Sequence, residues 1–289
     1  MNAVFVCFTG TGNTKRVCEA LAEAWCANGN EARICLLRAD MPAPDLADAD
    51  RLIGAFPVHG FNAPAPVLRF LKTLPAGDGR LAYLLRTSGE PLSFNDGAVT
   101  TPRRLLEKKG WRVAGDLHYV MPYNIIFRHS DGMASRMWRA VENRVSADAA
   151  RIGAGEGSLP SVGLGARAVA FVCRIEHPAA HWVGRGFRAT DACIGCGLCA
   201  RNCPEGNIRM EGGRPVFGKK CELCMACAFG CPKDAVRTGV LNGWRVNGGY
   251  DFDAPPASDA EVCAYCRNSY LKYYHSAENG AEACAEEAD

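Results

Sequence analysis

The chain has 289 residues, of which 48% are hydrophobic, and this is enough for one sizeable core and a smaller second domain. Its 33 basic and 31 acidic side chains leave a formal net charge of +2. Because the charge is so small, composition gives no electrostatic case for nucleic acid or an anionic membrane, and we expect neither as a partner. Sixteen cysteines are many, and their grouping must distinguish a disulfide framework from metal ligation.

Apolar runs that are typical of strands alternate with helical patterns over the first half of the chain. The expected strands cover 3–8, 31–37, 50–58, 80–87 and 111–121, and the expected helices cover 14–29, 65–74 and a stretch near 97–110. The strands are continuously apolar, as strands covered on both faces are. The pattern therefore predicts an α/β domain with a five-stranded parallel sheet and helices on both of its faces.

The stretch FTGTGNTKRV, residues 8–17, lies between the first strand and the first helix. A Rossmann fingerprint needs a third glycine where Lys15 stands, and a P-loop needs a G-x4-G-K-[ST] spacing that this stretch lacks. What remains is a set of hydroxyl and amide groups ahead of a helix whose free N–H groups suit a phosphate monoester. The candidate phosphate-binding residues are Thr9, Gly10, Thr11, Gly12, Asn13 and Thr14.

The sequence TGTGNT resembles the phosphate loop of the flavodoxin family, and the resemblance implies FMN as a cofactor. In such folds ligands bind at the carboxyl ends of the strands, so the loops 57–64 and 86–95 should contact the flavin ring. Gly60 and Gly89 allow a close backbone approach to the ring, while His59, Phe61 or Phe94 could pack on its face or simply fill the core. The two loops lack the pair of Trp and Tyr that sandwiches the ring in ordinary flavodoxins. The expected ring contacts are Pro57, Val58, His59, Gly60, Phe61, Thr87, Ser88, Gly89 and Glu90.

Two copies of the pattern C-x2-C-x2-C-x3-C-P stand at 193–204 and 221–232. An internal repeat of this kind implies two structurally equivalent halves. In this run three thiolates hold one iron-sulfur cubane, and the fourth cysteine, aimed away by the proline, ligates the other. Zinc sites or a disulfide scaffold are the alternatives, but zinc usually takes its ligands as separated pairs. The expected ligands are Cys193, Cys196, Cys199 and Cys231 for one [4Fe-4S] cluster, and Cys221, Cys224, Cys227 and Cys203 for the other.

This cysteine-rich region closely resembles the bacterial-type 2[4Fe-4S] ferredoxin family. The order of the two regions resembles the fused flavodoxin-ferredoxin proteins of anaerobic bacteria and archaea. The resemblance implies a cytoplasmic protein that passes electrons between FMN, two [4Fe-4S] clusters and external redox partner proteins. We expect a flavodoxin-like domain at 1–153, a linker and connecting helix at 154–187, a ferredoxin domain at 188–240 and a C-terminal extension at 241–289. Glycines in 154–165 predict a hinge.

Two further functions fit the same residues. One is an FMN-dependent reductase, in which a small organic substrate binds over the flavin and the iron-sulfur clusters supply its electrons. The other is a redox sensor, which ranks lower because no DNA-binding helix or basic patch is visible. The residues name no catalytic group for either function.

Two other segments carry weaker expectations. The apolar stretch 164–184 contains Arg167, Arg174 and Glu176, so we do not expect it to span a membrane, and no signal peptide is expected at the N-terminus. Cys263 and Cys266 form a lone C-x2-C that could be a redox dithiol, half of a metal site or simple packing, and packing is favoured. The chain after residue 236 is expected to be irregular.

Overall fold

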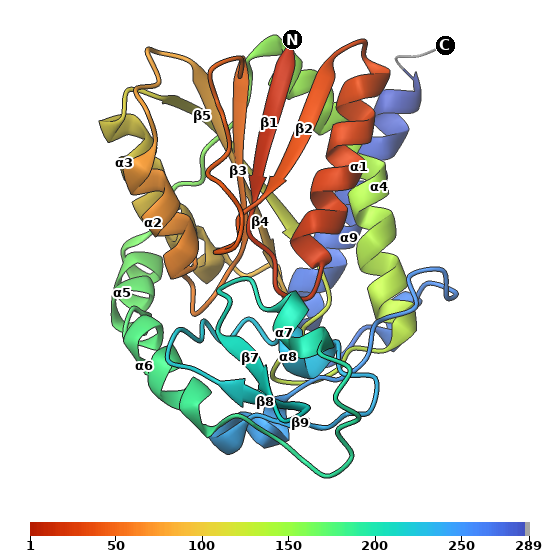
Figure 1. Cartoon of the computed structure of the whole chain (residues 1–289). Helices are drawn as coiled ribbons and strands as arrows, with labels where there is room; N and C mark the ends of the chain where they lie inside the picture. Colours follow the sequence, from red (N-terminus) through yellow and green to blue (C-terminus); the bar gives the residue numbers. More distant parts are fainter. Residues whose placement is uncertain (287–289) are drawn as a thin grey trace.

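A computed structural model describes residues 1–286, with side chains up to residue 279. Five strands form one sheet in which every neighbouring pair is parallel: β1 (Asn2–Cys7), β2 (Glu31–Leu36), β3 (Arg51–Pro57), β4 (Leu81–Ser88) and β5 (Arg112–Val120). Their order is β2-β1-β3-β4-β5 (Figure 1). This is the flavodoxin-like order of a doubly wound sheet, which confirms the predicted fold class.

Helices cover both faces of the sheet because successive strand residues point to opposite sides. In β1, Phe5 enters a core with Trp25 and Val141, beneath α1 (Asn13–Ala27) and α4 (Asp131–Ala154). Val6 enters the opposite core, beneath α2 (Ala65–Thr73) and α3 (Thr100–Lys108). The helix expected near 97–110 begins with a 3-10 segment, η1 (Ser93–Val99), and continues as α3.

The C-terminal segment is more regular than the sequence suggested. After a short 3-10 turn, η4 (Asp259–Glu261), the helix α9 (Arg267–Glu286) packs along α4, outside the sheet (Figure 1). Tyr270, Tyr274 and Ala277 are buried in this contact, and their spacing places them on one helical face. The expectation of irregular chain after residue 236 is therefore wrong for α9. Cys263 and Cys266 lie half-buried beside the same cluster of side chains.

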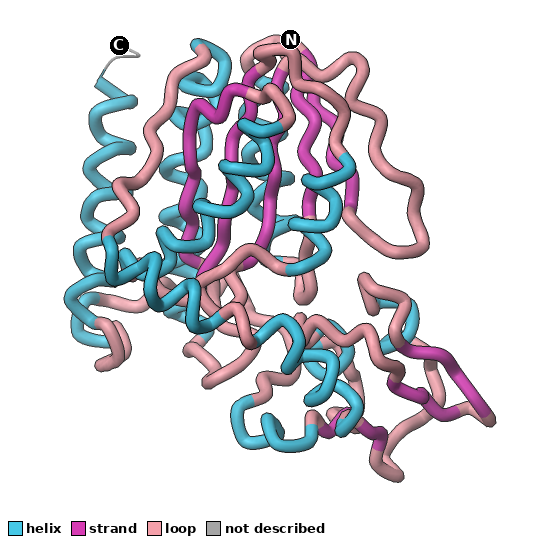
Figure 2. The backbone as a smooth tube through the Cα atoms, turned by 90° about the vertical axis from the view of Figure 1, so that its left-hand side faces the viewer, coloured by secondary structure: helices cyan, strands magenta, loops and turns pink. Residues whose placement is uncertain are grey.

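The chain leaves the sheet through α5 (Leu164–Cys173), α6 (Glu176–Val183) and the short 3-10 turn η2 (Gly184–Gly186). These segments follow one another down the outside of the molecule toward the cysteine-rich part (Figures 1 and 2). Of the helices in the described chain, none combines the length and the apolar character that crossing a bilayer requires.

The cysteine-rich part lies beyond the carboxyl ends of the parallel strands (Figure 1). It contains two small antiparallel sheets, β6 (Arg188–Ala189) with β9 (Val236–Arg237) and β7 (Ile208–Glu211) with β8 (Arg214–Phe217). Its helical segments are α7 (Leu198–Asn202), α8 (Ala226–Phe229) and η3 (Gly239–Trp244). The edge of the sheet at which ligands bind in such folds therefore faces the cysteines.

Candidate functional site

A cavity of about 400 Å³ lies between the carboxyl edge of the sheet and the cysteine-rich part. One wall comes from the loops that follow β1, β3, β4 and β5, and the other includes Leu223, Leu241 and Trp244. Of the residues expected to contact FMN, the cavity is lined by Thr9, Gly10, Thr11, Asn13, Thr14, Pro57, Val58, His59, Gly60, Phe61, Thr87, Ser88, Gly89 and Glu90. Gly12 does not line it. This glycine has a φ of 99° and turns the chain into α1.

The first turn of α1 is open to an anion. No side chain caps it, and it contains no acidic residue. Around it, Thr9 Oγ1 accepts from the Gly12 N–H at 3.2 Å, and Asn13 Nδ2 donates to the Pro122 carbonyl at 2.8 Å. No Lys or Arg is among the described residues that line the cavity. A phosphate here would be held by hydroxyl groups and backbone N–H groups, and this donor set fits FMN.

The glycines of the two ring loops make room for protein side chains. A methyl group at Gly89 would overlap the ring of Tyr123, and one at Gly60 would overlap the carboxylate of Glu176. The sequence suggested close approach of a flavin as the reason for these glycines. In the structure, the ring of Tyr123 already requires glycine at position 89, and the φ of 48° already favours glycine at position 60.

Aromatic side chains reach the cavity from three loops. His59 and Phe61 line it, whereas Phe94 packs edge-on against Phe61 with 6.2 Å between ring centroids and lies outside the lining. Tyr123, from the loop after β5, also lines the cavity, stacked on His129 at 5.2 Å. Trp244, at the end of η3, also lines the cavity.

Burial sets the protonation of the cavity. It raises the pKa of Glu90 to about 7, although a hydrogen bond from Asn95 Nδ2, 3.2 Å away, works in the opposite direction. The hydroxyl of Tyr123 donates to the other carboxylate oxygen of Glu90. Burial, and then the charge of His177, lowers the pKa of His59 to about 4. At neutral pH the cavity therefore contains a neutral imidazole and a carboxyl group close to its titration midpoint.

The two cysteine motifs have equivalent backbones. Gly195 and Gly197 have φ values of 68° and 73°, and the matching residues Leu223 and Met225 have 49° and 58°. The correspondence extends to the sulfur atoms. The N–H of Asn207 donates to Cys203 Sγ at 3.3 Å, and the matching N–H of Ala235 donates to Cys231 Sγ at 3.2 Å.

The thiols of the second expected set are mostly enclosed, since Cys227 is buried and Cys203, Cys221 and Cys224 are half-buried. Burial is the main cause that raises the pKa of Cys221 to about 11 and that of Cys224 to about 12, and the neighbouring Cys203 raises both further. Such thiols ionise readily only beside a cation, and the N–H donors on sulfur suit an iron-sulfur cluster. Across the described side chains, no three His, Cys, Asp or Glu are grouped as a single metal ion requires. A cubane differs in that its four thiolates bind four irons.

The second set adjoins the candidate flavin cavity directly. A methyl group at Gly10 would overlap both the carbonyl oxygen and the Cβ of Cys224, so the two loops touch backbone to backbone. Leu223, next in the chain to Cys224, is part of the cavity wall. The first set faces outward, since Cys196 is exposed and Ile194 is 61% exposed.

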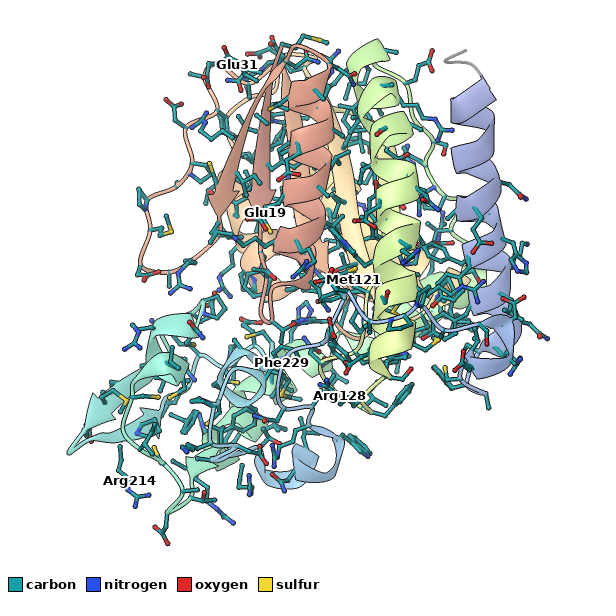
Figure 3. The ribbon with its side chains drawn as sticks, turned by 90° about the vertical axis from the view of Figure 1, so that its right-hand side faces the viewer. Glu19, Glu31, Met121, Arg128, Arg214 and Phe229 are labelled. Carbon is teal, nitrogen blue, oxygen red and sulfur yellow. The ribbon has the colours of Figure 1, made fainter. Side chains whose placement is uncertain are left out.

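Polar contacts hold the cysteine-rich part against the sheet domain. The N–H of Ala39 donates to the Pro204 carbonyl at 2.8 Å, and Arg69 pairs with Glu222 at 3.2 Å and with Glu205. Arg128, which lies with Phe229 between the two parts in Figure 3, donates to backbone carbonyls of 247–249. This closely packed interface argues against the hinge expected at 154–165.

Sequence reasoning missed part of the cavity. Met121, Pro122, Tyr123, Asn124, Ile125 and Ile126 follow the carboxyl end of β5, and the rule that selected the loops after β3 and β4 would also have found them. Asn95 lies within the expected loop 86–95 but was not among the expected ring contacts. Glu176, Leu223, Leu241 and Trp244 had no such signal, because they come from α6 and the cysteine-rich part, which reach the cavity only by docking onto the sheet.

Comparison with known proteins gave a family match for part of the chain. Residues 189–209 match the family described as 4Fe-4S binding domain, which covers the first cysteine motif. The comparison with curated proteins found no match.

Several solved structures resemble the sheet domain at low identity. A flavodoxin of Streptococcus pneumoniae TIGR4 has a TM-score of 0.41 and 16% identity over 53% of this chain and 99% of its own. An NADH:FMN oxidoreductase in its apo form has a TM-score of 0.41 and 21% identity over 56% of this chain and 92% of its own. A flavodoxin from the domain Archaea has a TM-score of 0.39 and 14% identity over 53% and 99%. The fold class rests on the strand order and not on these likenesses.

The chain thus combines a flavodoxin-like sheet with a 4Fe-4S binding sequence. Because iron-sulfur clusters of this type carry single electrons, the combination indicates an electron-transfer protein in general terms.

Proposed function

We propose that this protein is an iron-sulfur flavoprotein that exchanges electrons between FMN, two [4Fe-4S] clusters and external redox partner proteins. The observation that carries the proposal is the contact between Gly10 and Cys224, since it joins the candidate phosphate loop to the second cysteine set. When bound, FMN supplies a carrier of one or two electrons, and each cluster supplies a carrier of one.

Different residues would hold the FMN phosphate, the flavin ring and each of the two clusters. The uncapped start of α1, with Thr9, Thr11 and Thr14, would bind the phosphate, and the loops after β3, β4 and β5 would enclose the ring. Cys203, Cys221, Cys224 and Cys227 would hold the inner cluster, and Cys193, Cys196, Cys199 and Cys231 the outer one. Leu223 and Trp244 form part of the cavity wall on the side of the cysteines.

The first cysteine set lies nearer to solvent, and the second lies nearer to the cavity. Cys196 and the exposed Ile194 present the outer set at the surface, where a redox partner could dock. Cys227 is buried and Cys224 packs on Gly10, so the inner set has no comparable exposure. This order supports an exchange of electrons with a partner through the outer set.

A second candidate function is reduction of a small organic substrate at the flavin. Glu90 and Tyr123 favour it, because they form a hydrogen-bonded pair in the cavity and Glu90 has a pKa near neutrality. Such a group can hold a proton and release it to a substrate that accepts a hydride. Substrate-dependent oxidation of the reduced protein that slows in Glu90→Gln, while cofactor content is unchanged, would distinguish this function from simple electron transfer.

Anaerobic purification with quantification of iron, sulfide and FMN on one sample tests the proposal. We expect about eight iron, eight sulfide and one FMN per chain, as two cubanes and one flavin require. Iron without flavin would contradict the assignment of the cavity, and a preparation with zinc in place of iron would contradict that of the cysteines. For any variant of the cavity or of the cysteines, Gly163→Ala controls for the effect of a substitution as such on cofactor content, because nothing lies within 4 Å of the position of its new methyl group.

A further inference from the structure

The helices α5 and α6 carry large apolar side chains on the outside of the molecule. Leu164, Phe171, Val172, Ile175 and Trp182 are between 68% and 83% exposed. Arg174 and Ile175, between the two helices, keep helical dihedral angles, so the path is nearly continuous. At 3.6 residues per turn, the five side chains fall on one face, which we call the α5-α6 apolar face.

In these helices the large apolar side chains face solvent, whereas in a helix that covers a core they face inward. The fully buried residues of these helices are small, Ala166, Ala170 and Ala180, and the larger Glu176 and Val183 on the inward side are half-buried. Ala170 lies against Gly97, and its carbonyl accepts from Asn62 Nδ2 at 2.8 Å. A helix of a soluble domain normally buries its large apolar residues, so an exposed stripe of them marks an interaction surface.

The exposed charged residues of this segment are positive. Arg167 and Arg174 are exposed and fall along one edge of the face by helical spacing, and the exposed Arg185 follows in the 3-10 turn η2. Arg185 lies over the ring of Trp182 at 4.1 Å, and Arg174 over that of Phe171 at 5.6 Å. Glu176 is the one acidic residue between 157 and 190, and it points to the cavity on the other side of α6.

These charges distinguish between the possible occupants. A second copy bound about a two-fold axis would bring the arginines of both copies together without an exposed carboxylate from these helices to pair with them. An anionic bilayer surface offers apolar depth for the large side chains and phosphates for the arginines. The net charge of +2 hides this feature because acidic residues elsewhere in the chain balance the arginines.

We propose that the α5-α6 apolar face binds the surface of an anionic phospholipid bilayer, with both helices lying in the plane of the interface. Figure 2 looks onto the side of the molecule that carries these helices. Because Glu176 on the opposite side of α6 lines the cavity, binding would hold the cavity close to the membrane surface. The inference does not depend on which cofactor the cavity holds.

The test is co-sedimentation of the purified holoprotein with vesicles of phosphatidylcholine, alone or mixed equally with phosphatidylglycerol. We expect binding to the mixed vesicles only. Combined Arg167→Gln, Arg174→Gln and Arg185→Gln should weaken it about 100-fold, as expected for three basic side chains near an anionic surface. Arg33→Gln, Arg103→Gln and Arg209→Gln are a control with the same change in net charge, since each is paired with a carboxylate on the surface elsewhere. This control should bind as the unaltered protein does.

Combined Leu164→Gln, Phe171→Gln and Trp182→Gln should also abolish vesicle binding, while cofactor content and the midpoint of thermal unfolding stay unchanged. Equal binding to neutral and mixed vesicles, or binding that the arginine control weakens equally, would overturn the role of these arginines. A dimer that dissociates in the apolar variant, without vesicle binding by the unaltered protein, would overturn the proposal in favour of a second copy. A monomer that binds no vesicles would also overturn it.

Discussion

In the first copy of the cysteine motif Ile194 is exposed, whereas the matching residue of the second copy, Glu222, is buried against Arg69 of the sheet domain. The backbones of the two copies nevertheless follow the same path, with left-handed residues at equivalent positions. The first copy uses glycine at two of these positions, and the second uses Leu223 and Met225. A leucine or methionine in this conformation is uncommon and costs backbone energy.

The difference shows what docking onto the sheet demands of a repeated motif. Leu223 forms part of the cavity wall and Met225 is buried, so both side chains contribute packing that glycine could not. At the first copy a Cβ at Gly195 would overlap the carbonyl oxygen of Gly213, 2.7 Å away, and glycine adopts the same conformation without strain. One motif therefore serves as an outer site facing solvent and as an inner site against the cavity.

Removal of one ligand from each set gives the largest expected effect. Cys196→Ser and Cys224→Ser should each lose one cluster, so that iron falls from about eight to about four per chain. Only Cys224→Ser should also lose FMN, because the loop around Cys224 closes the cavity. Iron and flavin analysis of the two variants provides the measurement. If both lose flavin equally, or neither does, the distinction between an inner and an outer set is contradicted.

Burial of the Glu90 carboxyl group in the cavity should appear in the pH dependence of the free energy of unfolding. Because the pKa of Glu90 is raised to about 7, the folded protein binds more protons here than the unfolded chain between pH 4.5 and 7. The free energy of unfolding should therefore fall as the pH rises through this window, by up to about 3 kcal/mol. Chemical unfolding of the unaltered protein and of Glu90→Gln, at pH 5 and pH 8, measures the difference.

In Glu90→Gln this loss should be absent, so the variant should gain on the unaltered protein as the pH rises. The exposed Glu107→Gln provides a matched control and should leave the pH dependence as it is. A Glu90→Gln profile parallel to that of the unaltered protein would show that Glu90 is solvated and titrates normally.

The contact between the phosphate loop and the inner set can be tested at Gly10. Gly10→Ala forces a methyl group into the backbone of Cys224, and overpacking of this kind costs about 1–3 kcal/mol. We expect a lower free energy of unfolding and a lower flavin content. Gly163→Ala, in open space, should change neither. Normal stability and full flavin in Gly10→Ala would show that the two loops do not touch in solution.

The smallest expected effect concerns the left-handed backbone of the outer set. Gly197 has a φ of 73°, so Gly197→Ala should destabilise the protein by about 1 kcal/mol. Its new methyl group would meet the flexible end of Arg201 at 3.1 Å and Met210 Cγ at an ordinary contact distance of 3.9 Å. Gly243→Ala, which has no positive φ and no neighbour within 4 Å, is the control for denaturant unfolding. Equal stability of the two variants would remove the conformational reason for glycine in the outer set.

Much of the sheet domain could be predicted because its three central strands are mostly buried. The continuous apolar runs of β1 and β4 need no tertiary information, and glycines and polar residues mark where they end. The helix α9 was missed although Tyr270, Tyr274 and Ala277 recur at helical spacing. The helix follows Cys263 and Cys266 directly, and a short irregular segment before it separates its pattern from the cysteine motifs.

The cavity was only half predictable for a physical reason. Loops at the carboxyl edge of a parallel sheet meet by topology, so the sequence indicates that His59 and Glu90 share a site. Leu223 and Trp244 reach the same cavity because the cysteine-rich part docks on that edge. Such docking depends on many weak contacts between distant segments, and no local pattern encodes it.

The most direct test of the central claim is time-resolved reduction of the anaerobic holoprotein by a brief pulse of a one-electron reductant. The account predicts that iron-sulfur absorption bleaches first and recovers as flavin absorption falls. It also predicts that the initial bleaching is slowed in Cys196→Ser, which keeps its flavin. Flavin reduction that precedes the bleaching, or bleaching that is unchanged in Cys196→Ser, would contradict an inner cluster placed between the outer set and the flavin.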